Sequence, residues 1–384
     1  MKRPRKNFLM TRALAHGSNA WCRSLKADSA SFTLWWNDVL ERSSTMSTTS
    51  PEPPAMDTIH QLLFAVYPSF ALLAACQLDV FTPLKDGALT AEELAEKIQV
   101  GVSKLRPLLY ALVAANLLTV NDERFANTAE SSYYLVQGKP AYTGKRLNVA
   151  AKAWAAMLKT AGSIRAGVGL AHDEFDFANM ATEKVETLLR GFHAPALATG
   201  KMLADKFDFS ARDNLLDVGG GSGGVAIALL EKFPHLRATI VEQANVAPVT
   251  QRIVAESNVA ERVQVIASNA INDSLEGAFD CAILSAVIQL LSADEVRQLL
   301  QNVARVLNPN GALYIIGSVL DDSRLTPAEV ATLNLLFINS YDHGQAYTES
   351  EYRAWLTEAG FGEIQREILP SASSLISARK GKAI

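Results

Sequence analysis

The chain has 384 residues, 49% of them hydrophobic, and its 36 basic and 40 acidic residues leave a formal net charge of −4. This length predicts two domains and a tail rather than a single domain. The balanced charge argues against a nucleic-acid partner, and because no apolar run reaches the ~18 residues of a spanning helix, we expect no membrane segment.

Residues 1–55 differ in composition from the rest of the chain. They start with a basic cluster and continue rich in serine, threonine and proline, so we expect a disordered tail. An organelle transit peptide is one explanation. We favour the other, a start codon assigned too early, with initiation at Met46 or Met56. Three scattered cysteines show neither metal-ligand spacing nor a disulfide framework, which predicts a cytoplasmic protein with no metal site.

Residues 56–150 are expected to form a mainly helical domain. Apolar residues recur at helical spacing over 56–80, where Pro68 should kink the helix. Thr90 and Glu93 form a capping box that starts the next helix. A further helix and two short strands follow, and this order predicts a winged helix.

A winged helix can bind DNA or form a dimer, and the charge of the last helix of this domain indicates which of the two applies. It carries only Lys104 and Arg106 as cations, whereas a DNA-reading helix needs several side chains that neutralise phosphates. We therefore expect a dimerisation domain, which also explains the apolar first helix.

Residues 151–212 are expected to form an alanine-rich helical connector. His193 lies in its second helix, close to Pro195. This histidine is a candidate substrate contact, although a partly buried histidine beside a proline kink explains the pattern equally well.

From residue 213 to 384, strand patterns alternate with helical patterns. The fold class is therefore α/β, a doubly wound, Rossmann-like sheet with a parallel core. Ligands of such sheets bind beyond the carboxyl ends of the strands.

The first strand of this domain runs into Gly219-Gly-Gly-Ser-Gly-Gly224, with five glycines in six positions. Such a corner leaves backbone N–H groups free to meet a ligand, and with Glu242 after the next strand it also fits a dinucleotide site. However, Asp217 would place a carboxylate beside a pyrophosphate. S-adenosylmethionine has no phosphate. It carries a ribose that suits Glu242 and a cationic sulfonium, so we favour it as the cofactor.

These features together resemble the S-adenosylmethionine-dependent methyltransferases of the plant caffeate and bacterial small-molecule O-methyltransferase type. The resemblance covers about residues 60–375 and rests on Leu89-Thr-Ala-Glu-Glu-Leu-Ala-Glu96, Leu215-Leu-Asp-Val-Gly-Gly-Gly-Ser-Gly-Gly224, Asn308-Pro-Asn-Gly-Ala-Leu313 and Tyr347-Thr-Glu-Ser-Glu-Tyr-Arg-Ala-Trp355. It implies a small-molecule acceptor and a homodimer formed through the N-terminal domain.

The resemblance also implies cofactor-binding positions, which are Asp217, Gly219, Gly220, Gly221, Glu242, Asn269, Ala270 and Ser285. Glu242 is the ribose-binding acid. Asn269 stands where the family has an aspartate on the adenine side, and its amide can still bond an adenine edge. Ser285 stands where the family has a lysine, which implies a weaker contact.

The catalytic positions differ from those of the family. The family base is a histidine in a segment of the form I-x-H-x-W-S-D-E, and Gln289 occupies that position here. The glutamate that orients this histidine falls on Gly317. Glutamine cannot take a proton at neutral pH, but positioning alone supplies up to ~7–11 kcal/mol of a barrier. We therefore expect an acceptor that needs little base catalysis, either a thioether sulfur, as in methylthio hydroxy acids, or an activated carbon or oxygen.

Two alternatives remain open at this stage. A base from another loop, His343 or Tyr341, would make the protein a conventional O-methyltransferase. Alternatively, the chain is a cofactor-binding homologue without activity. The candidate acceptor contacts are His193, Phe337, Tyr341 and Tyr142.

Overall fold

The computed structural model of the protein describes residues 54–139, 141–177 and 179–381, so nearly all of the predicted tail lies outside the described residues. The chain divides into two units after Phe64. The described part of the first unit contains helix α2 (Asp57–Phe64), none of whose residues is buried.

The break in the first predicted helix lies at Ala65, and α3 (Val66–Gln77) begins directly after it. Pro68 therefore occupies the first turn of α3 instead of kinking a continuous helix. Proline lacks an N–H group and its ring clashes with the carbonyl four residues earlier, which is that of Phe64. The interruption consequently falls before the proline rather than at it.

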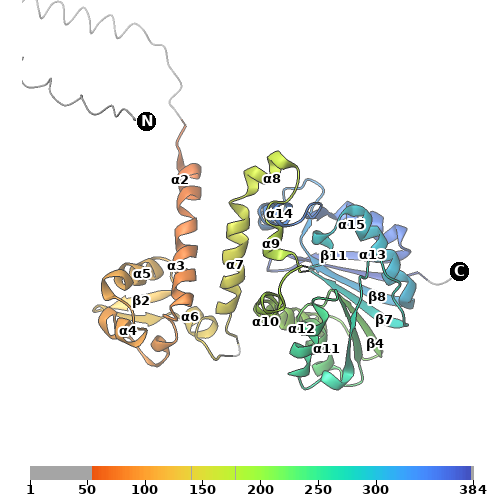
Figure 1. The fold of residues 1–384 in the computed structure, drawn as a ribbon, viewed down its shortest axis with the longest axis horizontal. Helices are drawn as coiled ribbons and strands as arrows, with labels where there is room; N and C mark the ends of the chain where they lie inside the picture. Colours follow the sequence, from red (N-terminus) through yellow and green to blue (C-terminus); the bar gives the residue numbers. More distant parts are fainter. Residues whose placement is uncertain (1–53, 140, 178, 382–384) are drawn as a thin grey trace, which may run out of the picture. The chain divides into compact units, whose positions relative to one another are not determined.

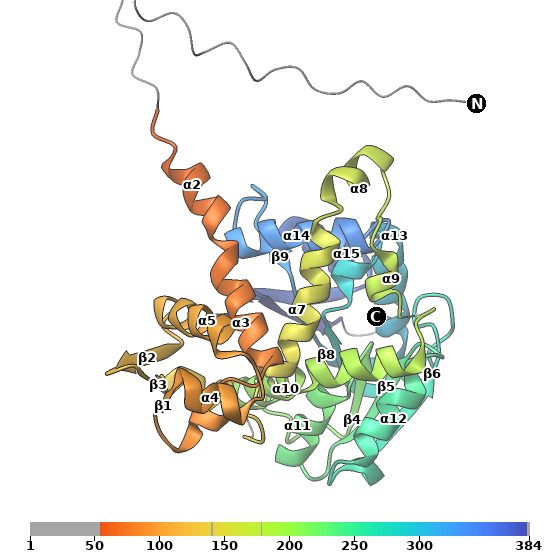
Figure 2. The same ribbon diagram turned by 60° about the vertical axis from the view of Figure 1, so that its left-hand side comes forward.

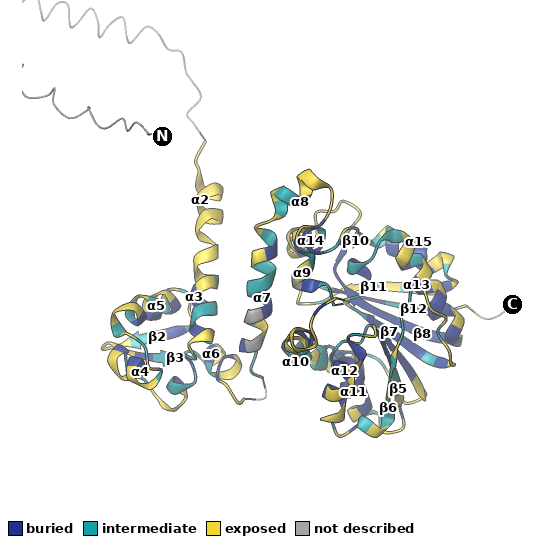
Figure 3. Ribbon diagram, in the orientation of Figure 1, coloured by how far each residue is buried: buried dark blue, intermediate teal, exposed yellow. Residues whose placement is uncertain are grey.

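Within the described residues, one helical stretch, Asp57–Gln77, has the length and mean hydropathy (1.6) to cross a membrane. The expectation that no stretch would reach this length was wrong, because a few polar residues interrupt the apolar run but leave the mean hydropathy of the helix high. Figure 3 shows α2 exposed along its length. Only its length and composition suggest that this helix crosses a membrane. It is also the helix that we assigned to dimerisation.

The next elements build the helical domain predicted for residues up to 150. They are the short helix Pro83–Asp86, β1 (Leu89–Thr90), α4 (Ala91–Lys97), α5 (Val102–Ala114), β2 (Leu118–Asn121), β3 (Arg124–Asn127) and α6 (Ala129–Tyr134). The capping box is confirmed, since Thr90 and Glu93 each accept the other's backbone N–H. Leu94, Leu109, Leu112 and Phe125 fill the core between α4, α5 and the small sheet β1-β3-β2.

The connector consists of α7 (Gly144–Met157), α8 (Thr160–Ala166), α9 (His172–Phe175) and α10 (Thr182–Lys206). The domain boundary predicted at residue 150 falls inside α7. Pro195 lies within α10 without ending it. Further along α10, an ideal Cβ on Gly200 would lie 2.5 Å from the carbonyl oxygen of Val225, so the glycine allows α10 to pack closely against the first helix of the next domain (Figure 2).

The C-terminal domain contains a seven-stranded sheet in the order β11-β12-β8-β7-β4-β5-β6. Its strands are β4 (Asn214–Val218), β5 (Arg237–Glu242), β6 (Val263–Ala267), β7 (Phe279–Ser285), β8 (Leu307–Gly317), β11 (Phe361–Ile368) and β12 (Ser374–Lys380). The predicted parallel core is confirmed from β6 to β8, whereas β12 runs antiparallel to both of its neighbours. The strand order reverses direction between β4 and β7, and ligands bind at such a point.

The helices of this domain are α11 (Gly224–Lys232), α12 (Ala247–Ala255), α13 (Ala293–Val306), α14 (Ala328–Ser340) and α15 (Glu349–Glu358). There is also a short helix at Ile288–Leu290, and β9 (Val319–Leu320) pairs with β10 (Tyr347–Thr348) in a two-stranded sheet.

Alternate residues of the central strands face opposite helical layers. Leu215 and Ile283 pack with α10 and α11, whereas Leu216 and Leu284 pack with α13 and α15. Figure 1 shows these two helical layers on the faces of the sheet.

Candidate functional site

The glycine stretch forms a tight corner between β4 and α11. Gly219, Gly221 and Gly223 all have positive φ angles, of 67°, 58° and 72°, a conformation that side chains other than glycine rarely adopt. An ideal Cβ on Gly219 would lie 2.7 Å from Val287 Cγ2, and one on Gly220 would lie 2.8 Å from the Asp217 carboxylate. Glycine is therefore required here both by backbone conformation and by lack of space.

Glu242, at the end of β5, is tied directly to this corner. Its Oε1 accepts the N–H of Gly221 at 2.7 Å, and its Oε2 accepts the N–H of Gln243 at 3.1 Å. Burial raises the pKa of Glu242 above its usual value. The hydroxyl of Thr250 donates to the carbonyl of Gly221 at 2.6 Å and holds the other side of the loop. Each carboxylate oxygen keeps acceptor capacity for a ligand hydroxyl group.

Asp217 contributes a second carboxylate beside the glycines. It is fully buried, and although the backbone N–H of Ala226 comes near it, neither of its oxygens accepts a hydrogen bond of normal geometry from the described residues. Burial, together with the nearby charge of Glu242, raises the pKa of Asp217 to about 7. A buried acceptor without a donor is costly, so this carboxylate indicates a site for a ligand that brings donors or positive charge.

Asn269 and Ser285 lie at the same edge of the sheet, after β6 and at the end of β7. The N–H of Ser268 donates to the Glu242 carbonyl at 2.9 Å, which brings the loop after β6 to the ribose-type acid. Oδ1 of Asn269 accepts the N–H of Ile271 at 3.0 Å, so its amide nitrogen is the end left to meet a ligand. The buried side chain of Asn302 donates to the carbonyl of Ala270 at 2.8 Å and fixes this loop from α13. The described residues therefore fit a nucleoside with a cationic neighbour.

The structure brings the two divergent positions together. Gln289 is 5% exposed, and an ideal Cβ on Gly317 would lie only 2.9 Å from its Oε1. The pairing of β7 with β8 causes this approach, since Ser285 pairs with Ile316 just before the two residues. Val287, which contacts Gly219, precedes Gln289 by two residues. The glycine corner, Gln289 and Gly317 thus form one continuous site.

The predicted acceptor contacts are distributed differently from what we expected. Nδ1 of His193 lies 3.0 Å from Oγ of Ser222, so this histidine meets the glycine stretch, and burial and Arg190 lower its pKa. Burial and then the charges of Cys76 and Asp79 raise the pKa of Tyr142, which therefore lies near the helical domain.

Phe337 and Tyr341 belong to α14 and the residue that follows it. Phe337 is buried in a cluster with Leu320 and Val330, and Tyr341 packs against the same cluster. Burial, followed by the charge of Asp176, raises the pKa of Tyr341 well above its usual value, which makes it a poor proton acceptor at neutral pH.

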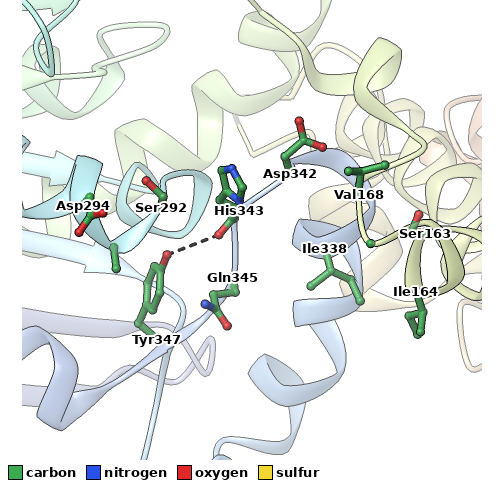
Figure 4. Close-up of a pocket in the computed structure, with 13 residues that line it drawn as sticks. Ser163, Ile164, Val168, Ser292, Asp294, Ile338, Asp342, His343, Gln345 and Tyr347 are labelled. Carbon is green, nitrogen blue, oxygen red and sulfur yellow. Dashed lines mark hydrogen bonds between the residues drawn. The ribbon is translucent and has the colours of Figure 1, made fainter.

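His343 lines a cavity of about 700 Å³. Figure 4 shows Ser292 and Asp294 at one side of this cavity, and Ile164 of α8 and Val168, which follows that helix, at the other. Of the residues predicted for the site, only His343 lines the cavity, and the glycine loop, Glu242 and Gln289 do not. Gly344 connects the two regions, because an ideal Cβ there would lie 2.9 Å from the backbone oxygen of Gln289.

Several residues of this site were not found from the sequence. Thr250, Val287 and Gly344 contact these loops in ways that no sequence spacing indicates. Tyr352 stands in the Tyr347–Trp355 segment, yet its position behind Gly317 follows only from the fold.

Comparisons with known proteins agree on one group. Residues 163–362 match the family described as O-methyltransferase domain, and residues 60–137 match the O-methyltransferase dimerisation domain. The chain is 27% identical over 340 residues to the 3-hydroxy-5-methyl-1-naphthoate 3-O-methyltransferase of Streptomyces sahachiroi, covering 87% of this chain and 98% of that protein. It is 24% identical over 335 residues to the L-tyrosine C(3)-methyltransferase of Streptomyces lavendulae, covering 82% and 88%.

Among solved structures, human N-acetylserotonin methyltransferase in complex with S-adenosylmethionine has a TM-score of 0.75 to this protein. The two are 23% identical, and the match covers 87% of this chain and 99% of the human one. At this identity the likeness concerns the fold.

Proposed function

Because the chain belongs to the O-methyltransferase family with an N-terminal dimerisation domain, we propose that it methylates a small acceptor that is nucleophilic without help from a protein base. It is an S-adenosylmethionine-dependent methyltransferase. The bound cofactor supplies an electrophilic methyl group on a positively charged sulfur.

The observation that carries this proposal is the Gln289–Gly317 contact. At the position that the resemblance assigns to the base there is a carboxamide, and Gly317, at the position that it assigns to the orienting glutamate, has no side chain. A carboxamide donates and accepts hydrogen bonds but does not take up a proton at neutral pH. Transfer at such a site relies on orientation of the nucleophile and on its own reactivity.

An acidic aromatic hydroxyl group is the acceptor that we place first. A relative that methylates the 3-oxygen of a hydroxynaphthoate supports an oxygen nucleophile, and a relative that methylates a tyrosine ring carbon supports an activated aromatic ring. A thioether sulfur, which has no proton to lose, is the second candidate. A conventional mechanism with His343 as the base is the alternative, favoured by the position of that residue at a cavity beside Gly344.

A series of phenols of graded acidity tests this proposal. Transfer of the labelled methyl group is measured as kcat/KM against pH for each phenol, with a methylthio acid as the thioether probe. Without a protein base, the pH at which the rate rises follows the pKa of each phenol. A rise at one fixed pH for all phenols, abolished by His343→Ala, would show instead that a protein base acts. Failure of every probe to accept a methyl group contradicts the acceptor class proposed here.

Cofactor binding should depend on pH through Asp217. Because its pKa in the folded protein is about 7, the carboxyl group is neutral below that pH and charged above it. The cationic cofactor favours the charged form, so its affinity should fall as the pH decreases through 7, approaching tenfold for each further pH unit. Calorimetry in buffers of different ionisation enthalpy should also detect proton release on binding near and below pH 7.

Asp217→Asn should remove this pH dependence and the proton release. The matched control is Asp205→Asn, at an exposed ion pair with Lys232, which should behave like the wild type. Proton release that persists in Asp217→Asn would assign the titrating group to another residue.

We also propose that the protein is a homodimer formed through its N-terminal domain. The dimerisation match covers residues 60–137, and in this range Val66, Phe70, Leu78 and Tyr110 expose large apolar surfaces. Apolar side chains exposed in this number are typical of an interface with another chain. A second copy of the chain is the partner that the family match supports.

A further inference from the structure

Two buried polar atoms lie close to the same glycine. Oε1 of Gln289 and the hydroxyl oxygen of Tyr352 are both enclosed, and neither has a hydrogen-bond partner among the residues that the structure describes. An ideal Cβ on Gly317 would lie 2.9 Å from the first and 3.9 Å from the second.

Tyr352 is held rigidly in this place. It lies in the first turns of α15, which starts with a capping box of Thr348 and Glu351. Its side chain is fully buried, and its ring centroid lies 5.9 Å from that of Trp355. A hydroxyl group in such a position normally has a partner, because leaving it unpaired is costly.

The chemistry of the two groups is complementary. The carbonyl oxygen of a carboxamide only accepts hydrogen bonds, whereas a tyrosine hydroxyl donates one. We propose that Tyr352 is a positioning residue, whose hydroxyl donates to Oε1 of Gln289 through one water molecule at Gly317.

This bond fixes which end of the carboxamide meets the acceptor. With Oε1 bound at Gly317, the amide nitrogen Nε2 is the end of the carboxamide that remains to meet the acceptor. Unlike Oε1, Nε2 is not a buried atom that lacks a partner. Nε2 only donates hydrogen bonds. The site then selects an acceptor that presents an electron-rich oxygen, such as a phenolate, over a protonated alcohol or a thioether. This conclusion rests on the proposed function and narrows its acceptor class.

The test uses 4-nitrophenol as a probe, because the ionised and neutral forms absorb at different wavelengths. The probe is titrated with the full-length protein in the presence of S-adenosylhomocysteine, so that binding is followed without methyl transfer. An Nε2–H group that donates to the bound oxygen should lower the pKa of the bound phenol. Tyr352→Phe should reduce this shift and lower kcat/KM for phenols by ~3–10-fold, as expected for one lost hydrogen bond. Affinity for the cofactor should not change.

A double-mutant cycle separates positioning from a general loss of packing. If Tyr352 acts through Gln289, then Tyr352→Phe has no further effect on the probe or on kcat/KM in a Gln289→Ala background. Tyr314→Phe, which removes a hydroxyl from a buried tyrosine in the other layer of the sheet, is the matched control and should leave both readouts unchanged.

A second pair of variants tests the role of Gly317. Gly317→Ala places a methyl group against Oε1 of Gln289 and should reproduce the effect of Tyr352→Phe, whereas Gly362→Ala, which has open space around it, should not. The inference is overturned if Tyr352→Phe matches the wild type in both readouts, or if its effect persists without Gln289. The absorbance readout does not need turnover, so it decides this point even if phenols are never methylated.

Discussion

Replacing Glu242 by alanine is expected to raise the dissociation constant for S-adenosylmethionine at least ~100-fold. Hydrogen bonds to a charged group contribute about 1.5–3 kcal/mol each, and we expect the two carboxylate oxygens to accept both ribose hydroxyls. The substitution also removes the acceptor of the Gly221 N–H, which is bound to Oε1 at 2.7 Å. Both effects act on the same loop, and ~1.4 kcal/mol corresponds to a tenfold change in affinity.

Calorimetry tests this expectation by measuring the affinity for S-adenosylmethionine of Glu242→Ala, Glu242→Gln and Glu261→Ala. The glutamine variant retains one acceptor oxygen and should lie between the wild type and the alanine variant. Glu261 is exposed beyond the opposite end of the neighbouring strand, so its replacement should have no effect. Wild-type affinity in Glu242→Ala would refute the assignment of this corner to the cofactor.

Gly219→Ala is expected to weaken cofactor binding by ~10–100-fold while the protein remains folded. The positive φ of 67° disfavours alanine by roughly 1–2 kcal/mol. In addition, the new methyl group would lie 2.7 Å from Val287 Cγ2, so the corner or the segment leading to Gln289 must move. Overpacking of this kind costs ~1–3 kcal/mol, and here the displaced atoms border the cofactor.

Gly138→Ala separates the two causes. Gly138 also has a positive φ, of 83°, but a Cβ there would meet no atom within 4 Å. Thermal unfolding should show a similar loss of stability from backbone strain in both variants, whereas only Gly219→Ala should lose affinity. Equal binding by the two variants would mean that the space beside Gly219 is irrelevant to the cofactor.

Much of the C-terminal fold follows from local pattern. β4 ends where the sequence predicts, because its apolar run stops at a cluster of glycines, which disfavours continuation of a strand. The capping boxes at Thr90 and Thr348 mark helix starts through contacts three residues apart. By contrast, β11 and α14 were not predicted. The residues of β11 are mostly polar, and α14 lacks a clear apolar stripe, so only their packing partners determine what they form.

The residues that we propose for cofactor binding were also identified from the sequence. Asp217, the glycines and Glu242 lie at the ends of two neighbouring strands, and the ends of parallel strands meet at one edge of a sheet. The glycine pattern alone did not distinguish a dinucleotide from S-adenosylmethionine. The distinction needed the other segments along the chain, and the family match agrees with it.

What the sequence by itself determined is therefore the fold class and the cofactor, whereas the residues of the cofactor corner and the loss of the base at Gln289 stay predictions, which rest on residues that are close along the chain or on strand ends. Only the tertiary structure decided how the remaining residues are used. It placed His193 on the glycine stretch, packed the half-buried Tyr341 against the cluster around Phe337, and brought Gln289 and Tyr352 to the same glycine, Gly317. These contacts join residues from different helices and strands, and their distances depend on how whole layers pack rather than on any local spacing.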